Sequence, residues 1–311
     1  MIEVVPYEAS AQATWDALVA DARGRHFLFE RGYMDYHADR FTDASLLVLR
    51  DGRAVAAMPA NREGDELISH GGLTFGGLLS DASMTVSRTL EAFEAIIAHL
   101  RATGVRRWVY KPVPHIYHLV PAEEDLFALS SYGATLVKRE VAAAIPAGRA
   151  ARRSSERRRA IARGRRADLT LGQDDAIEEF LALVGTVLRD RHDAEPVHTP
   201  AEMRLLADRF PDGIRLFTAR ADGELVSGVL IYETPAVARA QYIATSDRGY
   251  ELRAGDALFD HLLTAVYPDK PWFEFGTSNL QDGSINANLI RNKEGYGARA
   301  VVFDRYAVDV R

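Results

Sequence analysis

One order of helices and strands is predicted twice along the 311 residues of this chain, and this repeat constrains the fold more than any other feature. In each half two helices precede a hairpin, and alternating strands and helices follow the hairpin. Apolar runs flank Asp51-Gly52 in the first half and Asp222-Gly223 in the second, and Asp-Gly between such runs is the strongest short-range hairpin signal. We therefore predict a mixed α/β (α+β) protein of two similar domains, over 1–148 and 167–311, joined by a basic helical linker over 149–166.

The most informative stretch of the second half runs from Ala240 to Asp304. It starts with an apolar strand (Ala240–Thr245), passes through a polar turn with two glycines, and enters an amphipathic helix expected from Gly255 to Val266. A second apolar strand, Trp272–Phe275, then leads into a Gly/Ser/Asn-rich loop. A strand that turns into a helix leaves backbone N–H groups unpaired at the helix N-terminus, where they favour an anion such as a pyrophosphate.

Composition removes several classes of function. The chain has no cysteine, which excludes disulfides, thiolate metal sites and cysteine nucleophiles. A net charge of −6 argues against a general nucleic-acid binder. We expect no signal peptide and no membrane insertion, because no apolar run approaches the roughly 20 residues that a spanning helix needs. We therefore expect a cytoplasmic protein, and the oligomeric state stays open, a homodimer included.

The basic segment Gly148–Arg166 has three interpretations. It is a solvated helical linker whose arginines face water, since a charge run is usually a solvated face. Alternatively, its arginines form an electropositive wall for a polyphosphate. A nucleic-acid arm is the third interpretation, although one short basic helix in an acidic protein offers little area. The arginines concerned are Arg152, Arg153, Arg157, Arg158, Arg159 and Arg163.

Four segments together resemble the bacterial tandem-GNAT, Fem-like acyltransferases, and the resemblance runs from about His70 to the C-terminus. The segments are WVYKPVPHIYHLVPAEEDLFAL, RDRHDAEPVHTPAEMRLLADRFPDGIRLF, AQYIATS and LIRNKEGYGARAVVFDRY. The resemblance implies two GNAT-like domains, acetyl-CoA as the acyl donor, and no metal. It also implies an acceptor that is an amino sugar linked to a nucleotide, as in surface-polysaccharide biosynthesis. Fem-type enzymes of the same architecture instead take an aminoacyl group from tRNA.

The resemblance also implies where coenzyme A binds. In a GNAT domain a backbone N–H on the strand before the turn, here around Tyr242–Ala244, stabilises the oxyanion of the intermediate. The thioester lies where this strand diverges from Trp272–Phe275. The GNAT coenzyme A loop reads Gln/Arg-x-x-Gly-x-Gly/Ala, and this chain fits it only as Arg253-x-Gly, which leaves open which half binds the donor. The predicted cofactor-binding residues are Ile243, Ala244, Arg248, Arg253, Ala254 and Gly255.

Three residues of the second half are candidates for catalysis. Tyr242 could donate the proton that the leaving thiolate needs, or could be a half-buried strand aromatic. Glu274 faces away from its aromatic neighbours and is either a base with a raised pKa or the partner of an arginine. Lys293 precedes Glu294-Gly295-Tyr296-Gly297, a position that resembles the Fem-type lysine that assists acyl transfer. Lys293 would otherwise be a surface lysine paired with Glu294 or Asp304.

Strand ends and loops supply the remaining candidates, because α/β domains place their sites there. His70 or His118 is the predicted general base, since histidine titrates near neutral pH. If both halves face one cleft, Lys111 and His115 would join them there, with Lys111, His115, Asn286 and Asn288 binding the substrate. His115-x-x-His118 lacks a third ligand and does not predict a metal site.

The sequence thus predicts an N-acyltransferase in which the acceptor amine attacks the thioester directly. There is neither a cysteine nor a Gly-x-Ser-x-Gly elbow to carry a covalent intermediate. One alternative is a Fem-type, aminoacyl-tRNA-dependent transferase. The other is a non-catalytic GNAT module that binds a sugar nucleotide or a protein partner.

Overall fold

The structure is a computed structural model that describes residues 1–148, 152–192, 194–280 and 282–310. It divides into two compact units, Met1–Glu140 with Val302–Arg311, and Val141–Val301. Both are mixed α/β, which confirms the predicted fold class. The division differs from the predicted domains because 141–148 belong to the second unit and 302–311 to the first. The predicted linker begins at 149–151, which lie outside the described residues.

The first unit is built on short strands and one long helix. In it, β5 and β7 are parallel neighbours, β14 pairs with β7, and β1, β2, β3 and β6 form a separate sheet. Its elements are β1 (Ile2–Pro6), α1 (Gln12–Asp21), α2 (Arg31–Met34), β2 (Leu46–Arg50), β3 (Arg53–Met58), β4 (Asn61–Glu63), β5 (Glu66–Ile68), β6 (Leu79–Ser80), α3 (Val86–Ala102), β7 (Arg107–Tyr110), α4 (Glu124–Ser131) and the start of β8 (Thr135–Pro146).

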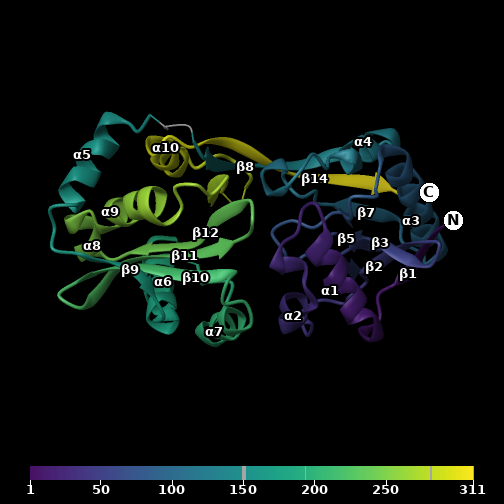
Figure 1. Cartoon of the computed structure of the whole chain (residues 1–311), viewed down its shortest axis with the longest axis horizontal. Helices are drawn as coiled ribbons and strands as arrows, with labels where there is room; N and C mark the ends of the chain where they lie inside the picture. Colours follow the sequence, from purple (N-terminus) through teal and green to yellow (C-terminus); the bar gives the residue numbers. More distant parts are fainter. Residues whose placement is uncertain (149–151, 193, 281, 311) are drawn as a thin grey trace. The chain divides into compact units, whose positions relative to one another are not determined.

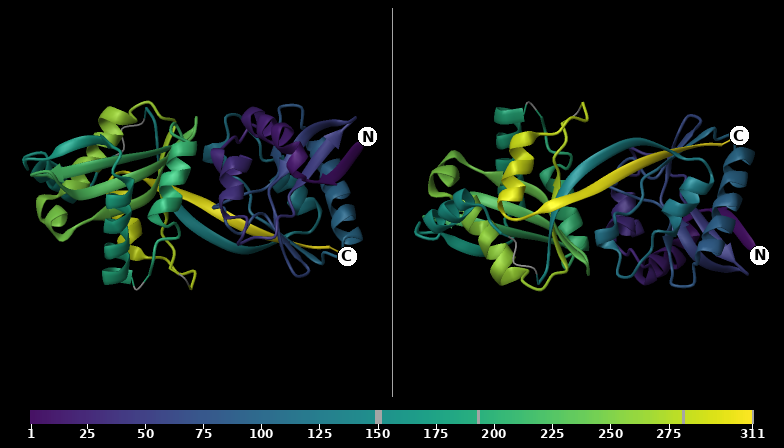
Figure 2. Two further views of the ribbon diagram at one scale, coloured as in Figure 1. Left: turned by 90° about the horizontal axis from the view of Figure 1, so that it is seen from below. Right: turned by 90° about the horizontal axis from the view of Figure 1, so that it is seen from above.

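The second unit is organised around the strand order β8-β13-β12-β11-β10-β9. The strand pair β12–β13 is parallel, whereas β9, β10, β11 and β12 are antiparallel neighbours. Its elements are α5 (Ser155–Gly164), β9 (Thr170–Asp174), α6 (Ile177–His192), α7 (Pro200–Arg209), β10 (Ile214–Ala221), β11 (Glu224–Glu233), β12 (Val237–Thr245), α8 (Asp247–Leu252), α9 (Ala254–His261), β13 (Trp272–Thr277), α10 (Ala287–Gly295) and the start of β14 (Arg299–Asp309). Figure 2 shows β8 and β14 side by side, and each contributes residues to both units.

Helices cover both faces of the sheet of the second unit, with α9 on one face and α6 with α7 on the other (Figure 1). Val229 and Ile231 of β11 belong to the core under α9. Gly228, which precedes Val229 and points to the opposite face, faces α6, and a Cβ there would lie 2.5 Å from the Phe180 ring. Because β11 is buried on both faces, it reads as a continuous apolar run instead of an alternating one.

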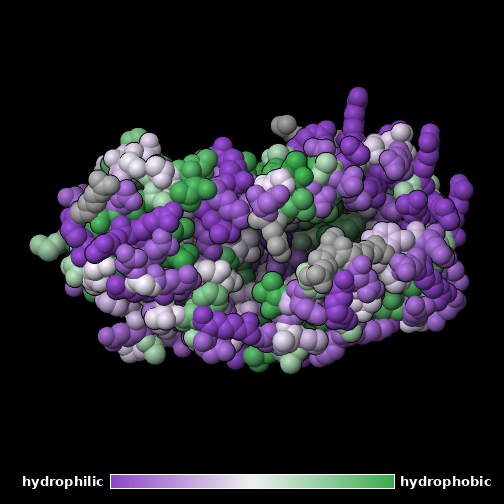
Figure 3. All heavy atoms as spheres, turned by 180° about the vertical axis from the view of Figure 1, so that it is seen from behind, coloured by the Kyte–Doolittle hydropathy of each residue, from purple (hydrophilic) through white to green (hydrophobic). Residues whose placement is uncertain are grey.

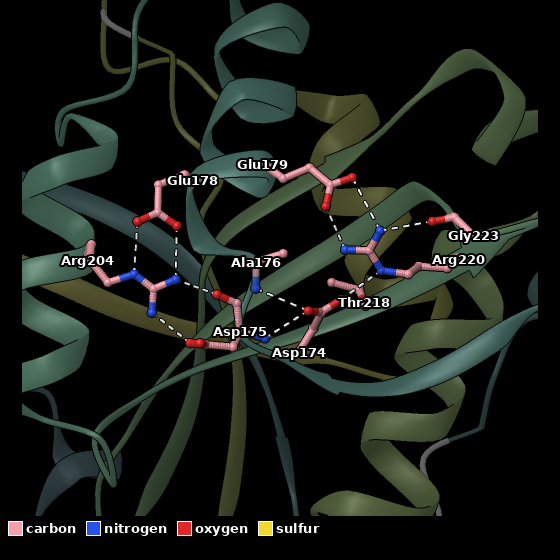
Figure 4. A network of polar contacts seen from close by, with 9 residues as sticks. All are labelled: Asp174, Asp175, Ala176, Glu178, Glu179, Arg204, Thr218, Arg220 and Gly223. Atoms are coloured by element: carbon pink, nitrogen blue, oxygen red, sulfur yellow. Dashed lines mark hydrogen bonds and ion pairs between the residues drawn. The ribbon is translucent and has the colours of Figure 1, made fainter.

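Charged contacts fix α6 and α7 to this face (Figure 4). Arg220 of β10 reaches Asp174 at the end of β9 and Glu179 of α6. Arg204 of α7 bonds to Glu178 through two nitrogens, and this bidentate form is the strongest arrangement of the pair. These contacts tie α7 to α6, and β10 to both β9 and α6.

Both predicted Asp-Gly hairpins are confirmed. Asp51 and Gly52 have φ of 51° and 78°, and Asp222 and Gly223 have 51° and 82°. Two consecutive positive φ angles define the turn whose twist matches that of paired strands.

Polar residues predominate on the face of the molecule drawn in Figure 3, where hydrophobic ones are scattered. Within the described ranges, no helix is both long and apolar enough to cross a membrane.

Candidate active site

Two neighbouring strands of the second unit diverge, and the site is built where they do so. The parallel ladder of β12 and β13 stops at Arg239↔Glu274, although β12 continues to Thr245 and β13 to Thr277. An irregularity in the pairing of β11 with β12, between Leu230 and Ile231, bends β12 at this point. Beyond the end of the ladder, backbone groups on this edge of β12 are available to an extended ligand.

The turn after β12 contains a helix break that the sequence did not predict. Ser246 caps α8, α8 ends at Arg253 in the left-handed conformation (φ 57°), and α9 starts at Ala254. The predicted helix 255–266 is therefore α9 followed by a π-helical turn over Leu262–Val266. A Cβ at Gly249 would lie 2.1 Å from the carbonyl oxygen of Val226, so only glycine allows α8 to approach β11 this closely.

The first-turn N–H groups of α9 border a cavity of about 110 Å³. Ile243, Tyr250, Arg253, Gly255 and Asp256 line it together with Arg157, Phe259 and Tyr296. A second cavity, lined from α5, α8, α9 and α10, shares Arg157, Tyr250, Arg253 and Asp256 with the first. The lining holds a helix N-terminus and two arginines, of which Arg157 pairs with Asp256, and donors of these kinds suit the diphosphate of coenzyme A.

The basic segment before this domain contributes directly to the cavity. It forms α5, which packs on α9 through Gly164, where a Cβ would lie 2.5 Å from the Arg253 carbonyl oxygen. Arg157 pairs with Asp256, and its guanidinium carbon lies 4.1 Å from the centre of the Tyr296 ring. Arg153 and Arg165 pair with Asp260 of α9. These arginines therefore hold α5 on α9, whereas Arg152, Arg158, Arg159 and Arg163 are exposed.

A buried ion pair lies where the ladder between β12 and β13 ends. Glu274 is fully buried, and its Oε2 accepts a hydrogen bond of 3.0 Å from Nη1 of Arg239. The other carboxylate oxygen accepts from the backbone N–H of Gly276 at 2.6 Å. Of the two interpretations of Glu274, this geometry corresponds to pairing with an arginine.

Lys293 is also buried and tied to the end of β13. Its Nζ donates to the carbonyl oxygens of Gly276 and Thr277, both at 2.7 Å, and to Oγ of Ser278 at 2.8 Å. Burial lowers the pKa of Lys293 to about 8, against which the nearby Glu274 carboxylate acts. Lys293 is therefore not the surface lysine paired with Glu294 or Asp304 that was its alternative, and Asp304 pairs with Arg139 instead.

Tyr242 has a partner that the sequence analysis did not assign. The phenol oxygen lies 2.7 Å from Nδ1 of His198, a 95% buried residue just before α7. Burial raises the pKa of Tyr242 to about 12, and hydrogen bonds from the backbone of His198 and Val197 oppose this. No local sequence signal links residues 198 and 242; only the tertiary fold brings them together.

The other predicted residues of the second unit lie at the rim of the site or away from it. Ile243 and Gly255 line the cavity, and Ala244 and Ala254 are buried beside it in β12 and α9. Arg248 pairs with Asp222 and Glu224 on the β10–β11 hairpin and is absent from the cavity lining. Asn286 caps α10, and the exposed Asn288 lines the second cavity.

Within the first unit, the structure brings Lys111 to the backbone of His70. Lys111 Nζ donates to the carbonyl oxygens of His70 and Leu73, at 2.6 and 2.7 Å, and burial lowers its pKa to about 7. Burial also lowers the pKa of His70 to about 3 and that of His118 to about 4. His118 lies beside Gly24, and His115 is exposed in a short turn. A cleft shared with the second unit stays a prediction.

Comparisons with known proteins agree with this geometry. The model of an acetyltransferase (GNAT) domain matches residues 149–281. No curated protein sequence matches the chain. Among solved structures, FemX superposes with a TM-score of 0.69 at 11% identity, covering 97% of this chain and 96% of that one. A tandem GNAT protein from the clavulanic acid biosynthesis pathway gives 0.55 at 14% identity, covering 100% and 99%. L-PGS from Bacillus licheniformis gives 0.58 at 13% identity, covering 94% and 90%.

At these identities the structural likeness concerns the fold, and it extends over nearly the whole chain. Residues 149–281, which include most of the unit that carries the cavity, match the model of an acetyltransferase (GNAT) domain, and the chain as a whole has a fold like those of FemX and the tandem GNAT protein.

Proposed function

We propose that the protein transfers an acyl group, in the simplest case acetyl, from coenzyme A to an amine in the site of its second unit. One observation carries this proposal. The cavity at the start of α9, lined by Arg157, Arg253 and Gly255, adjoins the end of the β12–β13 ladder. A donor with its diphosphate at the helix N-terminus would extend its thioester along the free edge of β12.

The residues of the chain divide the chemistry between them. Backbone N–H groups around Tyr242–Ala244 would stabilise the oxyanion as the amine attacks. The phenol of Tyr242 would give a proton to the leaving thiolate, because its raised pKa keeps it protonated at neutral pH. Glu274 and Lys293 fix the strand that forms the opposite wall, since their hydrogen-bonding groups are engaged within the protein.

The acceptor in this proposal is the amino group of a nucleotide-linked amino sugar, on the family resemblance given above. The net charge of −6 favours a small acceptor over a nucleic acid.

A second candidate, an aminoacyl-tRNA-dependent transferase, is favoured by two observations. The fold likeness to FemX covers nearly the whole chain. The exposed arginines of α5, Arg158, Arg159 and Arg163, offer a cationic surface to a phosphate backbone.

Thiol release separates the two candidates. The purified protein is incubated with acetyl-CoA and a panel of nucleotide-linked amino sugars, and free thiol is followed with a disulfide reagent. The chain itself has no cysteine, so any signal comes from coenzyme A. Acceptor-dependent release supports the proposal. Absence of both thiol release and coenzyme A binding contradicts it, and consumption of aminoacyl-tRNA would establish the second candidate.

A further inference from the structure

Consecutive residues of β12 point to opposite faces of the sheet at the place where the thioester would lie. Ile243 pairs in register with Val229 on the α9 face, is 40% exposed, and lines the coenzyme A cavity. Tyr242 pairs with Leu230, on the same face as Gly228, and that face is covered by α6. A donor that approaches from the α9 face therefore leaves the α6–α7 face to the acceptor.

On that second face, the phenol of Tyr242 meets His198, which lies immediately before α7. The Tyr242 oxygen and His198 Nδ1 are 2.7 Å apart. Hydrogen bonding from the backbone of Val197 and His198 lowers the pKa of this phenol against the effect of burial. In the tautomer whose imidazole proton is on Nε2, the phenol donates to His198 Nδ1.

The position of His198 is set firmly by the start of α7. Thr199 and Glu202 form a reciprocal capping box, and Pro200 occupies the first helical position. Arg204, one turn further along, is tied to Glu178 of α6. Such support keeps a side chain in one geometry, as a residue that orients a reacting group requires.

We propose that His198 is a positioning residue that orients the Tyr242 phenol and takes up its proton, and that the acceptor amine reaches the thioester from the face covered by α6 and α7. This inference rests on the proposed function of the same site. It changes the role of Tyr242 from an isolated acid to the middle of a proton relay.

The relay balances over one turnover. As the amine nitrogen forms its bond to the acyl carbon, an N–H proton passes to the Tyr242 oxygen, and the phenol proton passes to His198 Nδ1. The carbon–sulfur bond then breaks, and the thiolate takes the electron pair. The imidazolium returns its proton through Tyr242 to the sulfur. The products are an amide and a free thiol, and both side chains return to their starting forms.

The test compares Tyr242→Phe, His198→Asn and the double variant, using the full chain, acetyl-CoA and the best acceptor from the thiol-release panel. Asparagine at 198 can still accept the phenol hydrogen bond near the Nδ1 position, but it cannot hold a proton. We expect kcat to fall about 100-fold in each single variant, within the usual range of general acid–base catalysis. The double variant should lose no more than either single one, because both act in one relay. Coenzyme A affinity should stay within twofold of wild type.

His99→Asn is the matched control. It makes the same substitution in α3 of the first unit, away from the site of the second unit, and should leave kcat unchanged. If His198→Asn keeps more than a third of the wild-type kcat, or if the losses of the two single variants multiply in the double variant, the relay is refuted.

A measurement without turnover keeps this inference separate from the proposed function. Nitrogen-15 NMR of the imidazoles, with the His198 signal assigned through His198→Asn, should show an unprotonated Nδ1 in the wild type. That signal should shift in Tyr242→Phe. A protonated Nδ1 would overturn the inference even if the enzyme is active. If the wild type is inactive but shows the expected Nδ1 signal, the acyltransferase function is contradicted, whereas the hydrogen bond from Tyr242 to His198 is supported.

Discussion

Lys293→Met tests whether the buried lysine holds the end of β13. Methionine keeps the apolar stem and removes the ammonium, which leaves three acceptors without their donor. A buried acceptor left without a partner costs about 1–3 kcal/mol. The substitution also removes the cost of burying a charged ammonium. Because the pKa of Lys293 is about 8 instead of the ordinary 10.5, this raises the free energy of unfolding by roughly 3 kcal/mol at neutral pH. Three such acceptors cost about 3–9 kcal/mol together, so we expect the variant to be up to about 6 kcal/mol less stable at pH 7.

The same variant has a pH signature whose sign follows from linkage. Between pH 8 and 10.5 the unfolded wild type binds more protons at Lys293 than the folded form, so its free energy of unfolding rises with pH in that window. Lys293→Met lacks this rise, and the stability difference should widen by roughly 2 kcal/mol from pH 7 to pH 10.

Urea unfolding at both pH values, with hydrogen exchange of the β13 peptide to report on the second unit, measures this difference. Lys138→Met is the matched control, because its ammonium is on the surface and pairs only with Glu140. Equal stability of Lys293→Met and wild type, with no change in pH dependence, would refute the structural role assigned to Lys293.

Three further predictions concern the walls of the site. Gly164→Leu should push α5 off α9 and weaken coenzyme A binding, measured by calorimetry, about tenfold. Gly172→Ala should leave the affinity unchanged, because a Cβ there would meet nothing within 4 Å; equal affinities of the two variants would contradict the packing of α5 on α9. Glu274→Gln should lower the free energy of unfolding by about 3–5 kcal/mol, because it leaves the buried Arg239 without a compensating charge. A decrease below about 1 kcal/mol together with loss of turnover would instead indicate that Glu274 is a catalytic base. Arg253→Gln should weaken coenzyme A binding about tenfold while Arg248→Gln leaves it within twofold, and the reverse ranking would place the diphosphate elsewhere.

Local sequence signals predicted the framework of both units well. The Asp51-Gly52 and Asp222-Gly223 turns were predictable because their geometry depends on two residues alone. The strand ending at Thr245 and the α7 start at Thr199-Pro200 were likewise readable from patterning and capping.

Features that depend on distant partners were not predictable from the sequence. Arg157 occurred in a charge run that resembled a solvated face, yet its partner Asp256 lies 99 residues further along the chain. The helix expected over 255–266 starts at a left-handed Arg253, a conformation that sequence patterns rarely signal outside glycine and asparagine. His198 looked like one loop histidine among several until the fold placed it against Tyr242.

The central claim is that the start of α9 binds the diphosphate of an acyl-CoA, and a calorimetric titration of coenzyme A into Arg253→Glu tests it most directly. Arg253 is exposed and lines the cavity at the start of α9, so a glutamate there would replace a cation beside the diphosphate with an anion. At about 5 Å of separation and an effective dielectric of about 20, this repulsion costs about 3 kcal/mol. Arg159→Glu makes the same change of charge at an exposed position of α5 outside the cavity lining and is the control. We predict that Arg253→Glu folds normally and binds coenzyme A about 100-fold more weakly than wild type and Arg159→Glu. Equal affinities in all three proteins would contradict the account.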